Sequence, residues 1–358
     1  MLKKIYFIFL LAIFFSSLAR ANSFAARQGA LAGKIDQLTA SYESKVGMAF
    51  IDLKSGWQRS VNGTEEFPTA SVIKVAVMAT AYHLAELGEL DLNEKLTMKE
   101  SDRLGGSGVL QWMKAGRSYT VWNLCRMMIV LSDNSATKML VDRIGRAQIN
   151  NFMQELELKT IILNDRTMLV EPPSTEVNVS SPLDMAYLLQ RIKEAHGFSI
   201  NSSKEMLKFM RNQRYRWGIW RGVGPGTVIA DKTGNLEGIL NDVGVVYTSS
   251  GNYILSVFTR NIKKRPARLL INEISRITYE EYTGEKVQRP VKAIKVKKIR
   301  KFIAKRKAKK PVKAVKAKKT RKIILKQKLP RRPSVKSRPR SGHRGAVLNR
   351  KSPSSLRQ

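Results

Sequence analysis

The residues best suited to chemistry fall in three short strings: Ser71-Val72-Ile73-Lys74, Ser132-Asp133-Asn134 and Lys232-Thr233-Gly234. They occur in this order, and their first residues are 61 and 100 residues apart. Together they supply hydroxyls, two lysine amines and an amide, the groups needed for attack on a carbonyl and for proton transfer. Any one string is common by chance, but the ordered set indicates one site assembled from three parts of a domain.

The first string predicts an activated serine. Ser71 begins a helical pattern, so the backbone N–H groups and the helix dipole at this end favour a developing anion. Lys74 lies one turn further on the same face. A serine hydroxyl is a weak nucleophile that needs a base, and a lysine serves if desolvation or positive charge lowers its pKa. Lys232, delivered from the other side of a cleft, would supply that charge.

The other two strings suit the remaining tasks of such a reaction. Ser132 would relay a proton to a leaving nitrogen, and the Asn134 amide would contact a substrate carbonyl or side-chain amide. Lys232 and Thr233 would hold a substrate carboxylate. Backbone N–H groups of Ser71 and Asn235 would form an oxyanion hole, where each donor is worth roughly 3–4 kcal/mol in comparable hydrolases. The expected substrate-binding residues are Asn134, Lys232, Thr233, Gly234 and Asn235.

Each string also has a purely structural interpretation. Ser71 and Lys74 alone would be a helix cap and a solvated lysine. Ser132-Asp133-Asn134 alone would cap a helix that starts at residue 135. Lys232-Thr233-Gly234 alone would be an ordinary strand end. The three together favour a site over these alternatives.

The apolar periodicity predicts the elements that carry the strings. Helices are expected at 26–44, 71–87, 120–131, 135–144, 147–156, 182–196 and 266–282. Strands are expected at 46–53, near 57–61, and at 227–233, 242–248 and 253–260. The order predicts an α+β fold in which one antiparallel sheet is assembled from both ends of the domain.

Charge divides the chain unevenly. Of the 358 residues, 65 are Lys or Arg, and 30 of these lie in residues 286–358, which contain no Asp or Glu. The six prolines there and the lack of apolar periodicity predict a disordered basic tail. The catalytic part is therefore expected at 22–285.

The N-terminus predicts a cleaved signal peptide at 1–21. Lys3 and Lys4 precede an apolar run that is short for a membrane span, and Ala19-Arg20-Ala21 fits a cleavage site. An uncleaved membrane anchor is the alternative. We expect the mature protein to be secreted or periplasmic and to be a monomer.

Cysteine and histidine are too scarce for several other chemistries. Cys125 is the only cysteine, lies in an apolar run and is expected to be a buried small hydrophobe. The three histidines, at positions 83, 196 and 343, show no metal-ligand spacing and weaken a Ser-His-Asp triad. No metal and no cofactor are expected.

With these residues in view, the chain resembles the class A β-lactamase family of penicillin-recognising serine hydrolases over roughly residues 25–283. The segments 67–70, 124–134, 231–246 and 258–260 are similar to the family's as well. The resemblance implies a five-stranded antiparallel sheet flanked by helices, with an all-α subdomain. It also implies that Ser71 is the acylated nucleophile, that Lys74 and Ser132 form the proton relay, and that Lys232 binds the substrate carboxylate.

The segment 164–181 departs from the family pattern. Class A enzymes carry a glutamate there, in an E-x-x-x-N pattern, that positions the deacylating water. Glu171 matches its start, but Thr175 stands where the asparagine belongs. Glu176 with Asn178 is a shifted alternative, and a third possibility is that neither glutamate serves. Without such a base, a site of this kind acylates and then stalls.

Three functions follow. The first is a β-lactamase that acts through an acyl-enzyme on Ser71. The second is a penicillin-binding D,D-peptidase that acts on D-Ala-D-Ala stems. The third is a polyanion-binding protein whose tail binds anionic polymers or lipids of the cell envelope. A nucleic acid is a less favoured partner than the envelope polymers. Base stacking needs aromatic side chains, and Phe302 is the only aromatic residue in the tail.

Overall fold

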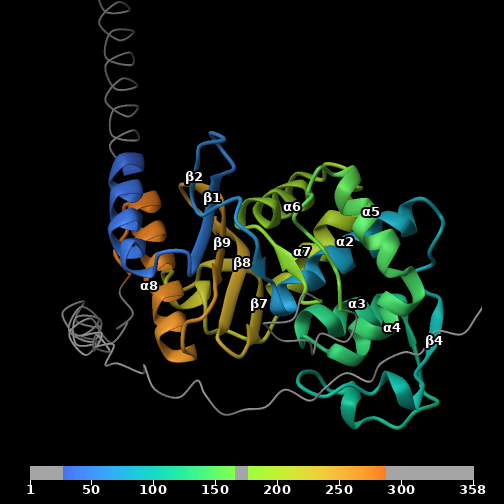
Figure 1. Cartoon of the computed structure of the whole chain (residues 1–358). Coiled ribbons are helices and arrows are strands. Elements are labelled where there is room, and N and C mark those ends of the chain that lie inside the picture. The colour runs from blue at the N-terminus through green and yellow to red at the C-terminus, as the bar shows by residue number, and fades with distance from the viewer. Residues whose placement is uncertain (1–26, 166–175, 288–358) are drawn as a thin grey trace, which may run out of the picture. The chain divides into compact units, whose positions relative to one another are not determined.

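A five-stranded antiparallel sheet in the order β2-β1-β9-β8-β7 forms the centre of the fold (Figure 1). The computed structural model describes residues 27–165 and 176–287. The strands are β1 (Val46–Asp52), β2 (Gln58–Val61), β7 (Val228–Leu236), β8 (Ile239–Thr248) and β9 (Gly251–Thr259). β1 pairs with β9 from Val46 opposite Thr259 to Asp52 opposite Tyr253, so both ends of the domain build one sheet. This confirms the predicted fold.

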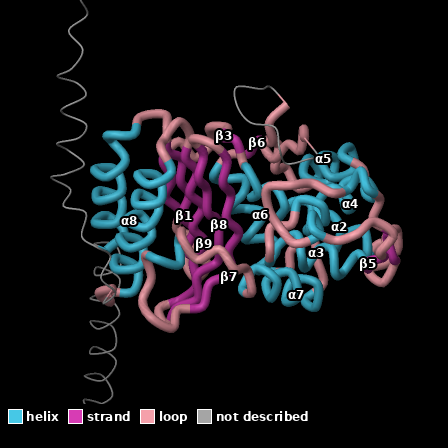
Figure 2. The backbone as a smooth tube through the Cα atoms, turned by 90° about the horizontal axis from the view of Figure 1, so that it is seen from below, coloured by secondary structure: helices cyan, strands magenta, loops and turns pink. Residues whose placement is uncertain are grey.

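Both faces of the sheet are covered, which explains why all seven residues of β1 are buried. On one face lie the helical segment 27–39 and α8 (Lys264–Thr283), whose apolar residues share a core with Phe50, Leu255 and Val257. On the other face lie the remaining helices, in a core with Ala49, Val243 and Ile254 (Figure 2). Alternate residues of one strand therefore enter two different cores.

The all-α part surrounds α2 (Lys74–Glu86), of which ten residues are buried, so this helix is apolar on nearly every side. Around it lie α3 (Val121–Val130), α4 (Asn134–Ile144), α5 (Arg146–Glu155), α6 (Pro182–Glu194) and α7 (Ile200–Arg211). The side chains of Thr120, Asp133, Ser181 and Ser199 cap α3, α4, α6 and α7 by accepting backbone N–H bonds. Across the part of the chain that the structure describes, no helix is both long and apolar enough to span a bilayer.

Several element ends differ from the prediction. The β7–β8 hairpin extends to Leu236 and Ile239, because the turn contains only Glu237 and Gly238, with Gly238 at φ 71°. The helix expected at 71–87 begins as a 3₁₀ turn, Ala70–Ile73. α7 and the two short sheets β3–β6 (Phe67–Pro68 with Val179–Ser180) and β4–β5 (Lys95–Thr97 with Ser118–Thr120) are absent from the expected elements. The strands of the two short sheets are two or three residues long, which leaves little periodicity to detect. α7, in contrast, has 12 residues with a buried apolar face, and the prediction missed it.

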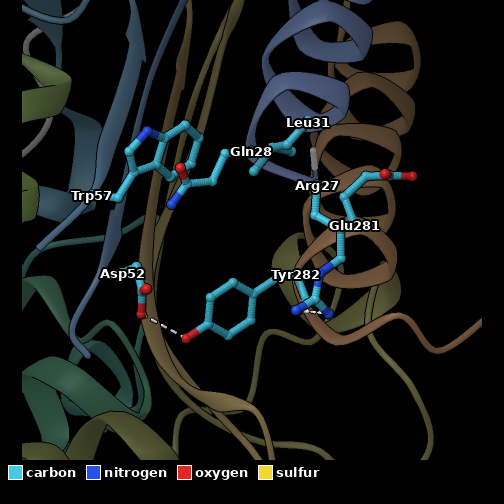
Figure 3. Close-up of a pocket in the computed structure, with 7 residues that line it drawn as sticks. All are labelled: Arg27, Gln28, Leu31, Asp52, Trp57, Glu281 and Tyr282. Atoms are coloured by element: carbon cyan, nitrogen blue, oxygen red, sulfur yellow. Dashed lines mark hydrogen bonds between the residues drawn. The ribbon is translucent and has the colours of Figure 1, made fainter. Parts of the chain in front are cut away.

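The end of α8 is fixed to the sheet by an aromatic cluster. The Tyr282 ring lies 5.8 Å from the Phe50 ring and 5.1 Å from the Tyr253 ring. The Tyr282 hydroxyl donates to Asp52 Oδ1 at 2.6 Å (Figure 3). The cavity beside this contact measures about 10 Å³, which is enough for one water molecule. We therefore regard this cavity as a structural feature of the helix–sheet contact.

Candidate active site

The three strings meet where the edge strand β7 faces the all-α part. The Ser132 hydroxyl lies between two lysine amines, 3.3 Å from Lys74 Nζ and 3.1 Å from Lys232 Nζ. These residues come from the start of α2, the α3–α4 connection and β7. The structure thus brings together groups that are 58 and 100 residues apart in the chain.

Ser71 stands in the 3₁₀ turn that leads into α2 and is half-buried. The preceding residue, Ala70, has φ 48°, a conformation that is uncommon for a residue with a side chain. The Asn241 amide donates to the Thr69 carbonyl at 3.0 Å, and Thr69 N–H donates to the Asn178 carbonyl at 2.8 Å. The strained turn is therefore held by β8 on one side and by the segment around Asn178 on the other.

Gly234 lets β7 approach this turn closely. A Cβ atom at Gly234 would lie 2.6 Å from the Thr69 carbonyl oxygen and 3.1 Å from Ala70 Cβ. Any side chain would thus push the edge strand away from the nucleophile. Of its neighbours on β7, Thr233 is buried and Asn235 is exposed.

Lys74 is fully buried, and its amine has three acceptors. Nζ donates to the Ser132 carbonyl at 2.7 Å, to Asn134 Oδ1 at 2.7 Å and to Ser132 Oγ at 3.3 Å. Burial, and next the charge of Lys232, lower its pKa well below the usual range, while Asp133 acts in the opposite direction. Among the described residues, Nζ forms no hydrogen bond with Ser71 Oγ. The amine that a base needs is present, but it is directed at Ser132.

The Ser132-Asp133-Asn134 string does two things at once. Asp133 caps α4 through Ala136 N at 2.9 Å and also accepts from Val109 N at 2.6 Å, so the capping interpretation holds for this residue. Ser132 has φ 54° and faces the two lysines. Asn134 Nδ2 donates to the Gly105 carbonyl at 2.8 Å while its oxygen faces Lys74. One turn therefore anchors a helix and presents two polar groups to the site.

Lys232 is also fully buried, with Nζ donating to Ser132 Oγ and to the Thr233 carbonyl at 2.8 Å. Burial lowers its pKa to about 7, against the charges of Asp231 and then Asp242, which raise it. A lysine with this pKa is partly protonated at neutral pH. It can bind a carboxylate, and it also keeps the pKa of Lys74 low.

Two buried carboxyl groups lie on the face of β7 and β8 that is opposite to Lys232. Asp231 Oδ2 accepts from Gln213 Nε2 at 2.6 Å, and Asp242 Oδ2 accepts from Ile219 N at 2.7 Å. Burial raises the pKa of Asp231 to about 7; burial and the Asp231 charge raise the pKa of Asp242 well above its usual range. Neither aspartate was among the predicted site residues. Their positions within otherwise apolar strands were the sequence signal that could have identified them.

The two candidates for the deacylating base are Glu171 and Glu176. Glu171 lies outside the described residues, and Glu176 is exposed at their edge. The side chain of Asn178 holds the flanks of the gap together, since Oδ1 accepts from Asn164 N at 2.7 Å and Nδ2 donates to the Asp165 carbonyl at 2.9 Å. The flanks of the segment are thus fastened beside Thr69, close to the Ser71 turn.

Comparison with known proteins agrees with this arrangement. The model of the "Beta-lactamase enzyme family" matches residues 30–282. The β-lactamase BRO-1 of Moraxella catarrhalis is 27% identical over 222 residues, covering 61% of this chain and 71% of that protein. The structure of PBP-A is 30% identical at a TM-score of 0.66, covering 71% of this chain and 96% of that one.

Two further structures extend the comparison. A variant of PBP-A has been solved as an acyl-enzyme complex with penicillin G, and it matches at 30% identity and a TM-score of 0.66. A β-lactamase from Sphaerobacter thermophilus is 27% identical at a TM-score of 0.66, covering 72% of this chain and 98% of that one. The family match spans well over half of the chain. The chain therefore belongs to the β-lactamase enzyme family and is a serine β-lactamase-like hydrolase.

Proposed function

We propose that this protein is an exported serine hydrolase that opens β-lactam rings through a covalent acyl-enzyme on Ser71. One observation carries the proposal: the Ser132 hydroxyl sits between two buried lysine amines beside the turn that holds Ser71. In the proposed reaction the uncharged form of Lys74, which its lowered pKa favours, accepts a proton, and the Ser132 hydroxyl passes one on. A structural role alone would not bury two lysines against one hydroxyl, because an unpaired buried charge is costly.

In the proposed acylation step, Ser71 Oγ attacks the lactam carbonyl and its proton passes to the Lys74 amine. The C–N bond of the lactam breaks, and Ser132 delivers a proton to the leaving nitrogen while Lys74 returns one to Ser132. The developing oxyanion is stabilised by the N–H groups of Ser71 and Asn235. Protons and electron pairs balance within the substrate and these side chains.

Substrate contacts complete the proposal. Lys232 and Thr233 would bind the substrate carboxylate, and the close approach that Gly234 allows would place β7 along the substrate. The Asn134 side-chain N–H would donate a hydrogen bond to the carbonyl of the substrate's own amide group. Hydrolysis of the acyl-enzyme needs a water-activating base, and we assign this role to Glu171, with Glu176 as the alternative.

The proposal is tested by intact mass spectrometry over time. The chain from residue 22 onward is mixed with a slight excess of benzylpenicillin. We expect a Ser71 adduct that appears and then clears as penicilloate accumulates, and no adduct in the matched Ser71→Ala variant. If the unaltered protein forms neither an adduct nor penicilloate, the assignment of the three strings is wrong.

The second candidate is a penicillin-binding D,D-peptidase, and a specific observation favours it. PBP-A, whose variant forms an acyl-enzyme with penicillin G, is as similar to this chain as the β-lactamases are. The mismatch at Thr175 also weakens the deacylation machinery. In the mass experiment, a peptidase-like enzyme would keep its adduct for hours.

Glu171→Ala separates the two candidates further. If Glu171 activates the deacylating water, the variant should acylate at the normal rate and then hold its adduct, lowering turnover by roughly two orders of magnitude or more. Glu176→Ala is the parallel variant, which should turn over normally if Glu171 is the base and should hold its adduct if Glu176 is. Unchanged turnover in Glu171→Ala would remove that residue from the mechanism.

Export and the basic tail belong to the same proposal. The predicted signal peptide at 1–21 would direct export of the enzyme from the cytoplasm. The proposed substrates act outside the cytoplasm. The tail at 286–358 carries 30 positive charges and would retain the enzyme on anionic envelope polymers or lipids. Neither segment is assigned a part in the chemistry.

A further inference from the structure

A groove of about 500 Å³ lies between α3 and α7 and contains none of the residues of the three strings. Its floor is formed by Trp122, Val130 and Phe209, and its rim carries Arg126, Lys208 and Arg214. An apolar floor with a cationic rim is an unusual combination on a protein surface that the proposed reaction does not use.

The floor is rigid and apolar. Val130 and Phe209 are 7% and 2% exposed. The Trp122 ring packs edge-on against Phe209 at 5.4 Å, and Trp122 Nε1 donates to Glu205 Oε1 at 2.8 Å. Because the ring is fixed by packing and by a hydrogen bond, its position does not have to be ordered when a ligand binds.

The rim cations are available for a ligand. Arg126, Lys208 and Arg214 are exposed, and none of them forms an ion pair with another described residue. Glu205, the acid on the groove side of α7, already accepts from Trp122 and from Tyr82. Residues 199–222 contain six Lys or Arg and one acid. The three cations of the groove outnumber the single nearby carboxylate, Glu205, so the groove is electropositive.

From these contacts we propose that the groove binds a small organic dianion with a flat ring. The ring would pack against the half-buried Trp122 side chain and leave water, which the apolar floor favours. The two acidic groups would accept charge-assisted hydrogen bonds from the rim, where the arginine forks suit carboxylates. A neutral ring would lack the hydrogen bonds to the rim cations. An aliphatic dianion would lack the contact with the apolar floor.

The groove adjoins the active site without overlapping it. Arg214 N–H donates to the Val130 carbonyl at 3.1 Å, and the Tyr215 hydroxyl donates to the Leu131 carbonyl at 3.2 Å. The next residue is Ser132. The groove wall is thus continuous with the segment that presents Ser132, and Ser71 is not among the residues that line the groove. The binding site does not depend on the proposed β-lactam chemistry.

Calorimetric titration of the full chain with naphthalene-2,6-dicarboxylate tests the proposal. We expect 1:1 binding at the groove, with the neutral naphthalene-2,6-dimethanol and the aliphatic succinate each binding at least tenfold more weakly. In Arg126→Gln/Lys208→Gln the dissociation constant should rise at least tenfold. The control Lys159→Gln/Lys204→Gln removes the same charge from exposed positions outside the groove and should change it less than twofold.

Fluorescence assigns the location. Binding should change the tryptophan emission of the unaltered chain, and Trp122→Phe should remove most of that change. The proposal fails if both double variants bind equally, which would point to the basic tail or to net charge. It also fails if the neutral ring binds as well as the dianion, since the rim would then contribute nothing.

Discussion

At the scale of single residues, burial decides the chemistry of this site. Lys74 and Lys232 are both fully buried, and burial is the main cause of the lowered pKa of each. The charge of Lys232 lowers the pKa of Lys74 further, while Asp231 and Asp242 raise that of Lys232. Burial thus favours the uncharged form of both amines, and the charge of Lys232 adds to this effect at Lys74.

The lowered pKa of Lys232 predicts a pH dependence. Lys232 has a pKa of about 7, so its protonated fraction falls as the pH rises through that value. If protonated Lys232 binds the substrate carboxylate, kcat/KM should decline above about pH 7, approaching tenfold per pH unit. Asp231→Asn removes the larger of the two charges that raise this pKa, so the decline should begin at lower pH. Asp242→Asn, the smaller contributor, should shift it less.

The check is the pH profile of kcat/KM for benzylpenicillin in the three proteins, with circular dichroism to establish folding. An identical profile in Asp231→Asn would mean that the Asp231 charge does not act on the group that sets the alkaline limb.

At the scale of elements, the site depends on how closely β7 approaches the 3₁₀ turn Ala70–Ile73. Gly234 makes this possible, and Asn241 on β8 ties the turn to the sheet through the Pro68 and Thr69 carbonyls at 2.8 and 3.0 Å. The backbone of the nucleophile turn is thus positioned by two strands that follow it by more than 160 residues.

Gly234→Ala should therefore damage the site. The added Cβ would meet the Thr69 carbonyl at 2.6 Å, and because the obstacle is backbone, the strand or the turn must move. We expect a loss of about 1–3 kcal/mol in the free energy of unfolding, typical of overpacking, together with a slower acylation rate. Urea denaturation and stopped-flow acylation measure the two effects.

Gly88→Ala is a control for the loss of a glycine, since nothing lies within 4 Å of its added Cβ. Gly88 has φ 76°, so this substitution should lower the free energy of unfolding but should not slow acylation. Equal acylation rates in the two variants would contradict the packing argument.

At the scale of the whole molecule, charge and chemistry occupy different parts of the chain. Residues 286–358 carry 30 of the 65 basic residues, whereas the three strings lie between positions 71 and 234. The described part ends with α8, which packs on the sheet face away from the all-α part (Figure 2). We infer that the tail can be removed without disturbing the site.

Deletion of residues 286–358 should leave benzylpenicillin turnover within about twofold and abolish salt-sensitive retention on isolated cell envelopes, because retention rests on electrostatic contacts that salt screens. Turnover and co-sedimentation at low and high salt provide the two readouts. If retention survives the deletion, the tail does not hold the enzyme on the envelope, and this conclusion is independent of the turnover measurement.

Much of this molecule could be predicted locally. Residue spacing placed Ser71 and Lys74 at a helix start, and periodicity of two or near four located β1, β8, β9 and most helices, because these patterns arise within one segment. Packing decided the rest. It directed Lys74 to Ser132 instead of Ser71, set the lowered pKa values, and put Asp231 and Asp242 behind Lys232. Burial and distance depend on segments remote in the chain, so only the tertiary structure could establish them.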